Sequence, residues 1–145
     1  MDLLAWRLCR EPFADLSGEG ARQYGGRWNA PGRPIVYAAS NPALAVLEVR
    51  VHLDLPPDLL PDDYVLIAID LDDLAMEGLS HMPDDPSAFG DAWLQELRSP
   101  VLQVPSLIVP ENPNLLINPM HPHAVRARIV SKRPFAFDRR LWFPH

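Results

Sequence analysis

Short apolar runs alternate along the chain with stretches rich in proline, glycine and polar residues. Apolar runs of four to eight residues bounded by turn-forming residues are typical of buried strands. Four such runs occupy residues 3–8, 34–38, 64–71 and 114–117, and the third is the clearest. Residues 125–130 instead alternate apolar side chains with arginine, which predicts a half-exposed strand, and Phe135 and Phe137 continue that pattern.

Two helices are predicted between these strands. The first begins at Asn41-Pro42 and runs to about Leu53, because asparagine caps helices well and proline is favoured at the first helical position. The second covers residues 87–97, where Phe89, Trp93 and Leu97 recur four residues apart on one face. Strands therefore dominate, and the pattern predicts an α+β domain with two or three short helices.

Proline content excludes one further class of fold. The chain has 17 prolines in 145 residues, roughly twice the average usage of about 5%. Proline inside a helix removes a hydrogen bond and clashes with the preceding turn, so a bundle of long helices is excluded. A mass of 16.3 kDa is the usual size of one domain, and no linker or internal repeat divides the chain. We therefore expect a single domain over residues 1–145.

The net charge of −6 is distributed unevenly. Residues 51–100 carry twelve acidic residues and one arginine, whereas both flanking parts carry more basic than acidic residues. This acidic middle argues against a general nucleic-acid-binding protein, although a local arginine pocket for a small anion stays open. Twelve of the thirteen basic residues are arginines, which suits phosphate binding but is equally explained by the codon usage of a GC-rich genome.

Several other sites are not predicted. Cys9 is the only cysteine, so the chain has neither an internal disulfide nor a cysteine-based zinc site. His121 and His123 flank a proline without a nearby carboxylate, so we predict no metal site. The chain contains neither a Walker loop nor a nucleophile elbow. No secretory signal or membrane span is visible, and a soluble cytoplasmic protein is expected.

Glu48 is the most informative single residue. It lies in the first predicted helix, which is apolar nearly all round, and burying an unpaired carboxylate there would be costly. Either Glu48 lines a cleft, or it forms a structural ion pair or a link to His52, four residues further along. The sequence leaves these alternatives open.

Three other features could carry chemistry. Gly25-Gly26-Arg27 could bring backbone and guanidinium close to a phosphate, although such loops are also common elsewhere. Tyr37 offers a ring and a hydroxyl, but a core aromatic is equally consistent with its position. Ser106 is the only hydroxyl in an apolar stretch, and it could bind a ligand or satisfy a neighbouring backbone group.

These residues, in this order, resemble the RES-domain family. The matching stretches span about residues 6–138 and include Trp6-Arg7, Gly-Gly-Arg27-Trp-Asn, Ile-Val-Tyr37-Ala-Ala-Ser, Ala-Val-Leu-Glu48-Val, Phe-Gly-Asp-Ala-Trp-Leu at 89–94, Val-Pro-Ser106 and Asn118-Pro-Met-His121-Pro. The resemblance implies a fold similar to ADP-ribosyltransferases, with a pair of packed β-sheets and a few short helices around an NAD⁺ cleft. It also implies the toxin of a bacterial toxin–antitoxin pair that cleaves the nicotinamide–ribose bond of NAD⁺ by hydrolysis or phosphorolysis.

The resemblance also implies site residues and partners. Arg27 would hold the phosphates or ribose of NAD⁺, Tyr37 would stack on or bond near the nicotinamide ribose, Glu48 would stabilise the developing oxocarbenium, and Ser106 would position ligand. Arg7, Asn118 and His121 would line the pocket. NAD⁺ would be a substrate, with no prosthetic group, and an Xre-type antitoxin on a separate chain would bind the toxin and contact DNA.

Two alternatives stay open. A chain of the same fold could transfer ADP-ribose to a protein, and a non-enzymatic domain could use its acidic middle to bind a basic partner. A homodimer or a higher complex with the antitoxin is also open, since Trp142 and Phe143, expected to be exposed, would suit a partner surface.

Overall fold

The structure is a computed structural model that describes residues 3–142. Seven strands form one sheet in the order β4-β5-β6-β2-β1-β3-β7, in which β4 and β5 are parallel and the other neighbours are antiparallel. The strands are β1 (Leu4–Arg10), β2 (Val36–Ala39), β3 (Tyr64–Asp70), β4 (Met76–Gly78), β5 (Val101–Val104), β6 (Asn114–Ile117) and β7 (Arg128–Pro134). The helices are α1 (Glu19–Tyr24), α2 (Pro42–Arg50) and α3 (Pro86–Glu96), with short 3-10 turns at Glu11–Phe13, Pro57–Leu59, Ala124–Arg126 and Arg139–Leu141. The α+β class and the few short helices are confirmed.

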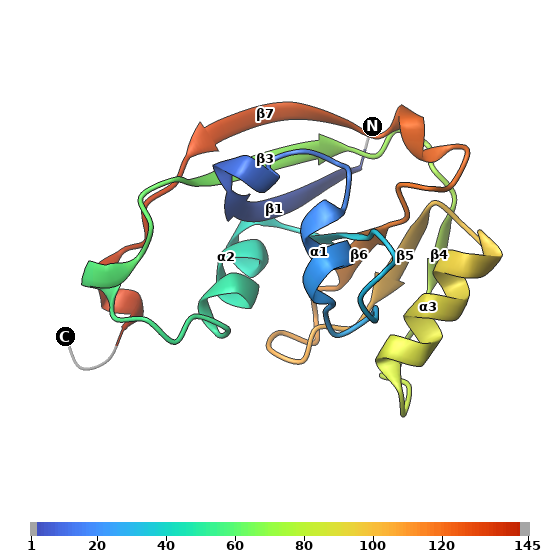
Figure 1. The fold of residues 1–145 in the computed structure, drawn as a ribbon, viewed down its shortest axis with the longest axis horizontal. Helices are drawn as coiled ribbons and strands as arrows, with labels where there is room; N and C mark the ends of the chain where they lie inside the picture. Colours follow the sequence, from blue (N-terminus) through green and yellow to red (C-terminus); the bar gives the residue numbers. More distant parts are fainter. Residues whose placement is uncertain (1–2, 143–145) are drawn as a thin grey trace.

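The structure has one seven-stranded sheet rather than the expected pair of packed sheets, and a narrow junction between β1 and β2 divides it into two halves. Strands β1 and β3 pair along their whole length, whereas β1 meets β2 at a single register pair, Trp6 with Ala39. In Figure 1, β1, β3 and β7 run across the view, while β4 and β5 lie at a steep angle to that direction. The narrow β1–β2 junction therefore lets the sheet bend between its two halves.

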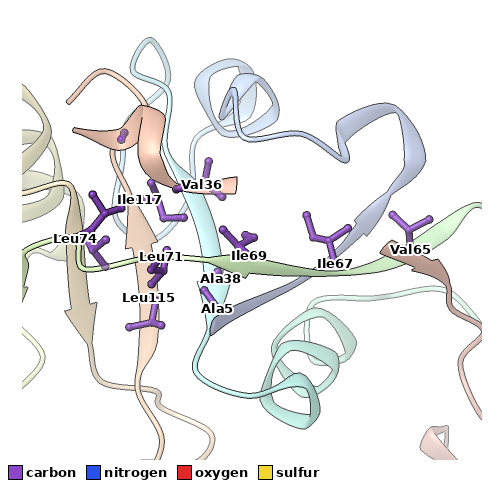
Figure 2. Close-up of a cluster of buried hydrophobic side chains, with 13 residues drawn as sticks. Ala5, Val36, Ala38, Val65, Ile67, Ile69, Leu71, Leu74, Leu115 and Ile117 are labelled. Carbon is purple, nitrogen blue, oxygen red and sulfur yellow. The ribbon is translucent and has the colours of Figure 1, made fainter. Parts of the chain in front are cut away.

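One core cluster contains side chains from both halves of the sheet. Alternate side chains of β3 point into it, together with alternate side chains of β2 and β6, because successive residues of a strand face opposite sides. Figure 2 shows Ile67 and Ile69 of β3 in this cluster with Leu115 and Ile117 of β6. On the other face of the sheet, α2 and α3 each cover a smaller cluster of their own. Helices α2 and α3 thereby cover the face of the sheet that points away from the central cluster.

The predicted helices form where their capping residues stand. The Asn41 side chain accepts a hydrogen bond from the Leu44 backbone N–H at 2.8 Å, so α2 begins at Pro42 as predicted. Asp85 caps α3 in the same way through Ala88 N–H, at 3.1 Å. Helix α2 ends at Arg50 rather than near Leu53, because residues 51–53 turn away and the Arg50 guanidinium donates to the Leu53 carbonyl.

Three local predictions were wrong or incomplete. The loop predicted over 11–33 contains α1, a six-residue helix that begins after Gly18. The strand predicted as half-exposed begins at Arg128 rather than at residue 125, since Ala124–Arg126 form a 3-10 turn, and six of its seven residues are exposed. Strand β4 was not predicted, because it has three residues and depends on parallel pairing with β5.

Trp142 is buried rather than exposed, which corrects the expectation that it forms a partner surface. Its indole N–H donates to the Leu55 carbonyl at 2.8 Å, and the Arg50 guanidinium lies 4.1 Å from its ring centroid. Phe143, the other residue of that expectation, lies outside the described residues.

Candidate active site

A cavity of about 520 Å³ opens between α1, α2 and the loop that joins β5 to β6. Strands β1 and β2 contribute its floor, and its volume lies in the range of small-molecule sites. Among the predicted site residues, the lining includes Arg7, Arg27, Tyr37 and Glu48. The fold therefore brings four residues that are dispersed along the first third of the sequence into one cavity.

Glu48 lines this cavity from α2, with its carboxylate held by two neutral donors. The Asn114 side-chain amide donates to Oε2 at 2.7 Å, and the Ser106 hydroxyl donates to Oε1 over a longer 3.5 Å. No lysine, arginine or histidine among residues 3–142 forms an ion pair with Glu48. Of the two alternatives left open by the sequence, the structure supports the carboxylate that lines a cleft.

Ser106 lies behind the cavity wall rather than in it. Its side chain is buried, and its oxygen accepts hydrogen bonds from the backbone N–H groups of Ile108 and Val109, both at 3.1 Å. The hydroxyl proton is then directed toward Glu48. This geometry makes Ser106 a support for Glu48 and for the β5–β6 loop.

The Tyr37 hydroxyl holds the glycine-rich loop in place. It accepts a hydrogen bond from Trp28 N–H at 2.9 Å and donates to Asn29 Oδ1 at 2.6 Å. Burial raises the pKa of this hydroxyl to about 12, so the phenol stays protonated as a donor. The Asn29 amide in turn donates to backbone carbonyls, including that of Ala21 in α1.

Two glycines allow this loop to pass close to Tyr37. Gly25 has φ +73°, a conformation that L side chains rarely adopt, and a Cβ at Gly26 would lie 2.6 Å from the Tyr37 hydroxyl. Arg27 follows directly and is exposed, and it forms no hydrogen bond or ion pair with another described residue. Its guanidinium is therefore free for an anion in the cavity.

Helix α3 supports the same loop from outside. Gly90 packs so closely that a Cβ there would lie 1.8 Å from the Trp28 carbonyl oxygen. Asp91 accepts a hydrogen bond from Ala30 N–H at 3.2 Å, and Trp93 is fully buried with its indole N–H on Ser99. The Phe-Gly-Asp-Ala-Trp-Leu stretch is thus the surface on which the Arg27 loop rests.

The RES domain family model matches residues 4–138, nearly the whole chain. The chain belongs to the RES domain family. It is 38% identical to "Toxin Res" of Pseudomonas putida over 148 residues, covering 97% of this chain and 100% of that protein. It is 41% identical to the "Prs ADP-ribosylating toxin" of Sphingobium sp., with 94% of both chains covered.

A solved structure shares the fold of this RES domain. The crystal structure of the MbcT–MbcA toxin–antitoxin complex of M. tuberculosis matches with a TM-score of 0.78 and 22% identity, over 94% of this chain and 85% of that one. In sequence, the protein named NAD(+) phosphorylase MbcT is 33% identical over 90 residues, which cover 54% of this chain and 48% of that protein.

Arg7 lines the RES-domain cavity from β1, and one nitrogen of its guanidinium is hydrogen-bonded to backbone carbonyls. Its Nη1 donates to the carbonyls of Phe13 at 2.7 Å and Asp15 at 3.1 Å. Arg7 therefore braces the segment that follows β1, and it presents the rest of its positive charge to the cavity.

Asn118 and His121 do not line the cavity, which corrects their placement in the pocket wall. Asn118 is buried, with its amide donating to the Leu94 carbonyl and its side-chain oxygen accepting from Met120 N–H. The Nδ1 of His121 accepts from His123 N–H, and desolvation together with the neighbouring His123 lowers the pKa of His121. Both residues stabilise the turn after β6.

Residues 3–142 contain no group of three or more histidine, cysteine, aspartate and glutamate side chains placed to hold a metal ion. None of their helices is long and apolar enough to cross a membrane.

Asn114 was not predicted as a site residue, and Asn29 was given no role of its own. Asn114 was noted only as the first residue of a strand, and Asn29 only as part of a motif. An asparagine that begins an otherwise apolar strand is an unusual polar position, and this was the available signal for Asn114. Its distance to Glu48 depends on the pairing of β6 with β2, which the pattern of residues does not specify.

Tyr37→Phe is expected to lower the stability of the protein. Trp28 N–H would lose its acceptor, and an unpaired, largely buried donor costs about 1–3 kcal/mol. The alkaline pH dependence should also become flatter. The pKa of about 12 in the folded protein exceeds the ordinary tyrosine value of 10.0, so the unfolded chain releases this proton first and wild-type stability falls between these pH values.

Melting curves at pH 9 and pH 11.5 test this expectation. The exposed Tyr24→Phe is the matched control and should melt like the wild type at both pH values. An equal alkaline loss of stability in Tyr37→Phe and the wild type would contradict the role assigned to the Tyr37 hydroxyl.

Proposed function

We propose that this RES protein is the toxin of a toxin–antitoxin pair and that it cleaves the nicotinamide–ribose bond of NAD⁺. The observation that carries the proposal is the Glu48 carboxylate, which forms no ion pair with another described residue and lines the same cavity as the free guanidinium of Arg27. The names of its relatives, which include toxins and an NAD(+) phosphorylase, support the same substrate.

The charges of the cavity fit this bond cleavage. When the C–N bond breaks, its electron pair goes to the positively charged nicotinamide ring, which leaves as a neutral molecule. Positive charge then develops on the ribose, and a fixed carboxylate such as Glu48 stabilises it in the transition state. Because the leaving group needs no proton, one carboxylate suffices, unlike the pair used by ordinary glycosidases.

The cationic side chains suit the other end of the substrate. Arg27 and Arg7 line the cavity from different elements, and guanidinium groups bind phosphate oxygens through paired hydrogen bonds. Binding the pyrophosphate there would leave the ribose free to reach Glu48. The net negative charge of the chain does not oppose this, because both arginines lie in the part with slightly more basic than acidic residues.

Purified protein incubated with NAD⁺, without antitoxin, is expected to release nicotinamide. NAD⁺ labelled in its adenosine part separates the acceptors, because free ADP-ribose means hydrolysis, a phosphate-dependent product means phosphorolysis, and label on a protein means transfer. Absence of nicotinamide release would contradict the proposed function. If NAD⁺ also failed to raise the melting temperature, the non-enzymatic alternative would be favoured.

ADP-ribosylation of a protein is the second candidate. It is favoured by the relative named as an ADP-ribosylating toxin, which matches 94% of this chain at 41% identity. The cavity chemistry is the same for both candidates, and they differ only in what attacks the ribose.

We further propose that an antitoxin on a separate chain binds this protein, because the structural neighbour was solved as a toxin–antitoxin complex. An Xre-type antitoxin that contacts DNA, and a cytoplasmic location, are parts of this proposal. Co-expression with an antitoxin gene adjacent to the gene for this chain should restore growth and yield a stable complex on purification.

A further inference from the structure

Asn114 occupies a position that three strands hold in place. It begins β6, where it pairs with Ala39 of β2 on one side and with Val104 of β5 on the other. Its backbone is thereby fixed from both sides, and its side-chain amide lines the cavity 2.7 Å from Glu48 Oε2. A donor on such a support is oriented before substrate binds.

The second oxygen of the Glu48 carboxylate has a weaker partner. Ser106 Oγ lies 3.5 Å from Oε1 and already accepts two backbone hydrogen bonds from the β5–β6 loop. At this length the hydrogen bond from Ser106 is marginal, whereas the hydrogen bond that the Asn114 side-chain amide donates is short. Asn114 is therefore the main group that sets the direction of the carboxylate.

The neutral character of Asn114 matters for the chemistry. A lysine or arginine in its place would cancel the charge that Glu48 offers to the ribose, whereas an amide orients the carboxylate and leaves that charge in place. We propose that Asn114 is a positioning residue, which holds the Glu48 carboxylate toward the reacting ribose without neutralising it. This inference rests on the proposed function, because it assigns Asn114 a role in that same reaction.

Other titratable groups face the cavity from the surrounding elements. Arg7 and Cys9 line it from β1, Arg27 from the glycine-rich loop, Tyr24 from α1, Tyr37 from β2, and His52 from the turn after α2. His52 is exposed and forms no ion pair with Glu48 among the described residues. These groups are common to the wild type and its Asn114 variants, so a change in pH profile between them reports on position 114.

Two substitutions test the role of Asn114. Asn114→Ala should lower kcat for nicotinamide release about 10- to 100-fold, since hydrogen bonds to charged groups are worth that much, while KM changes less than about threefold. Asn114→Asp keeps the shape but places a second carboxylate beside Glu48, and two carboxylates this close cannot both ionise easily. Once protonated, the introduced acid can donate as asparagine does, so its activity should rise as pH falls from about 8 to 5.5, relative to wild type.

Asn112 provides the matched control. It lies two residues earlier, is half-buried and does not line the cavity, so Asn112→Ala and Asn112→Asp should keep the kcat and pH profile of the wild type. If the wild type releases nicotinamide and both Asn114 variants keep its kcat and pH profile, the inference is overturned and the proposed function stands. A wild type that releases none overturns the proposed function and, with it, this role. Should Asn114→Ala fail to fold, the near-isosteric Asn114→Asp decides alone.

Discussion

Replacing Glu48 with glutamine is expected to lower nicotinamide release from NAD⁺ by at least about 10²- to 10³-fold, the usual effect of losing one electrostatic contact to a transition state. Glutamine keeps the volume of the side chain and can still accept from Asn114, so the packing of α2 should be unchanged. It loses the negative charge that the developing cation on the ribose requires. The effect should therefore fall on kcat, with NAD⁺ binding largely retained.

Steady-state kinetics and growth assays measure this effect together. Glu96→Gln is the matched control, because Glu96 is an exposed carboxylate at the end of α3 and does not line the cavity. That variant should keep wild-type activity and arrest growth when produced without antitoxin. Full growth arrest by Glu48→Gln, at equal protein levels, would remove Glu48 from the catalytic role.

Gly90→Ala is expected to have the largest effect on stability, about 3 kcal/mol or more. The added Cβ would lie 1.8 Å from the Trp28 carbonyl oxygen, and the clash is with backbone rather than with a flexible side chain. Either α3 must move away from the Arg27 loop or the loop must move into the cavity. Both movements should also reduce NAD⁺ cleavage, since the position of Arg27 depends on this contact.

Thermal unfolding should show a lower melting temperature by roughly 10 °C for Gly90→Ala. Gly78→Ala is the control, because a Cβ at Gly78 meets nothing within 4 Å, and that variant should melt like the wild type or slightly above it. A Gly90→Ala protein with wild-type melting temperature would show that α3 does not rest on Trp28 as the structure has it.

Much of the fold follows from local sequence, because its signals act over a few residues. The first six residues of β3 are apolar, and all seven of its residues, including Asp70 at its end, are buried. Asn41 and Pro42 start α2 through a hydrogen bond that spans three residues. By contrast, α1 and β4 have six and three residues, too few for a periodic pattern, and both depend on contacts with distant segments.

The residues of the candidate site also differ in how far the sequence could predict them. Glu48 was identified because a lone carboxylate in an apolar helix is costly, and Arg27 because two glycines precede it. The sequence could not distinguish a residue that faces the cavity from one that supports its wall. Ser106 was expected to position ligand, yet it does not line the cavity and instead accepts from the β5–β6 loop backbone. Tyr37 lines the cavity as expected, but its hydroxyl is bound to Trp28 and Asn29, a contact that the sequence did not predict.

The sequence by itself determined the α+β class, the family and the one carboxylate around which the site is built. These properties depend on residue types and on spacings along the chain. Only the tertiary structure decided that the sheet bends at a single β1–β2 pair, that Asn114 meets Glu48 across 66 residues of chain, and that Gly90 supports Trp28. Such contacts depend on strand register and on the approach of backbones, and both are determined by the packing of the whole domain rather than by any local pattern.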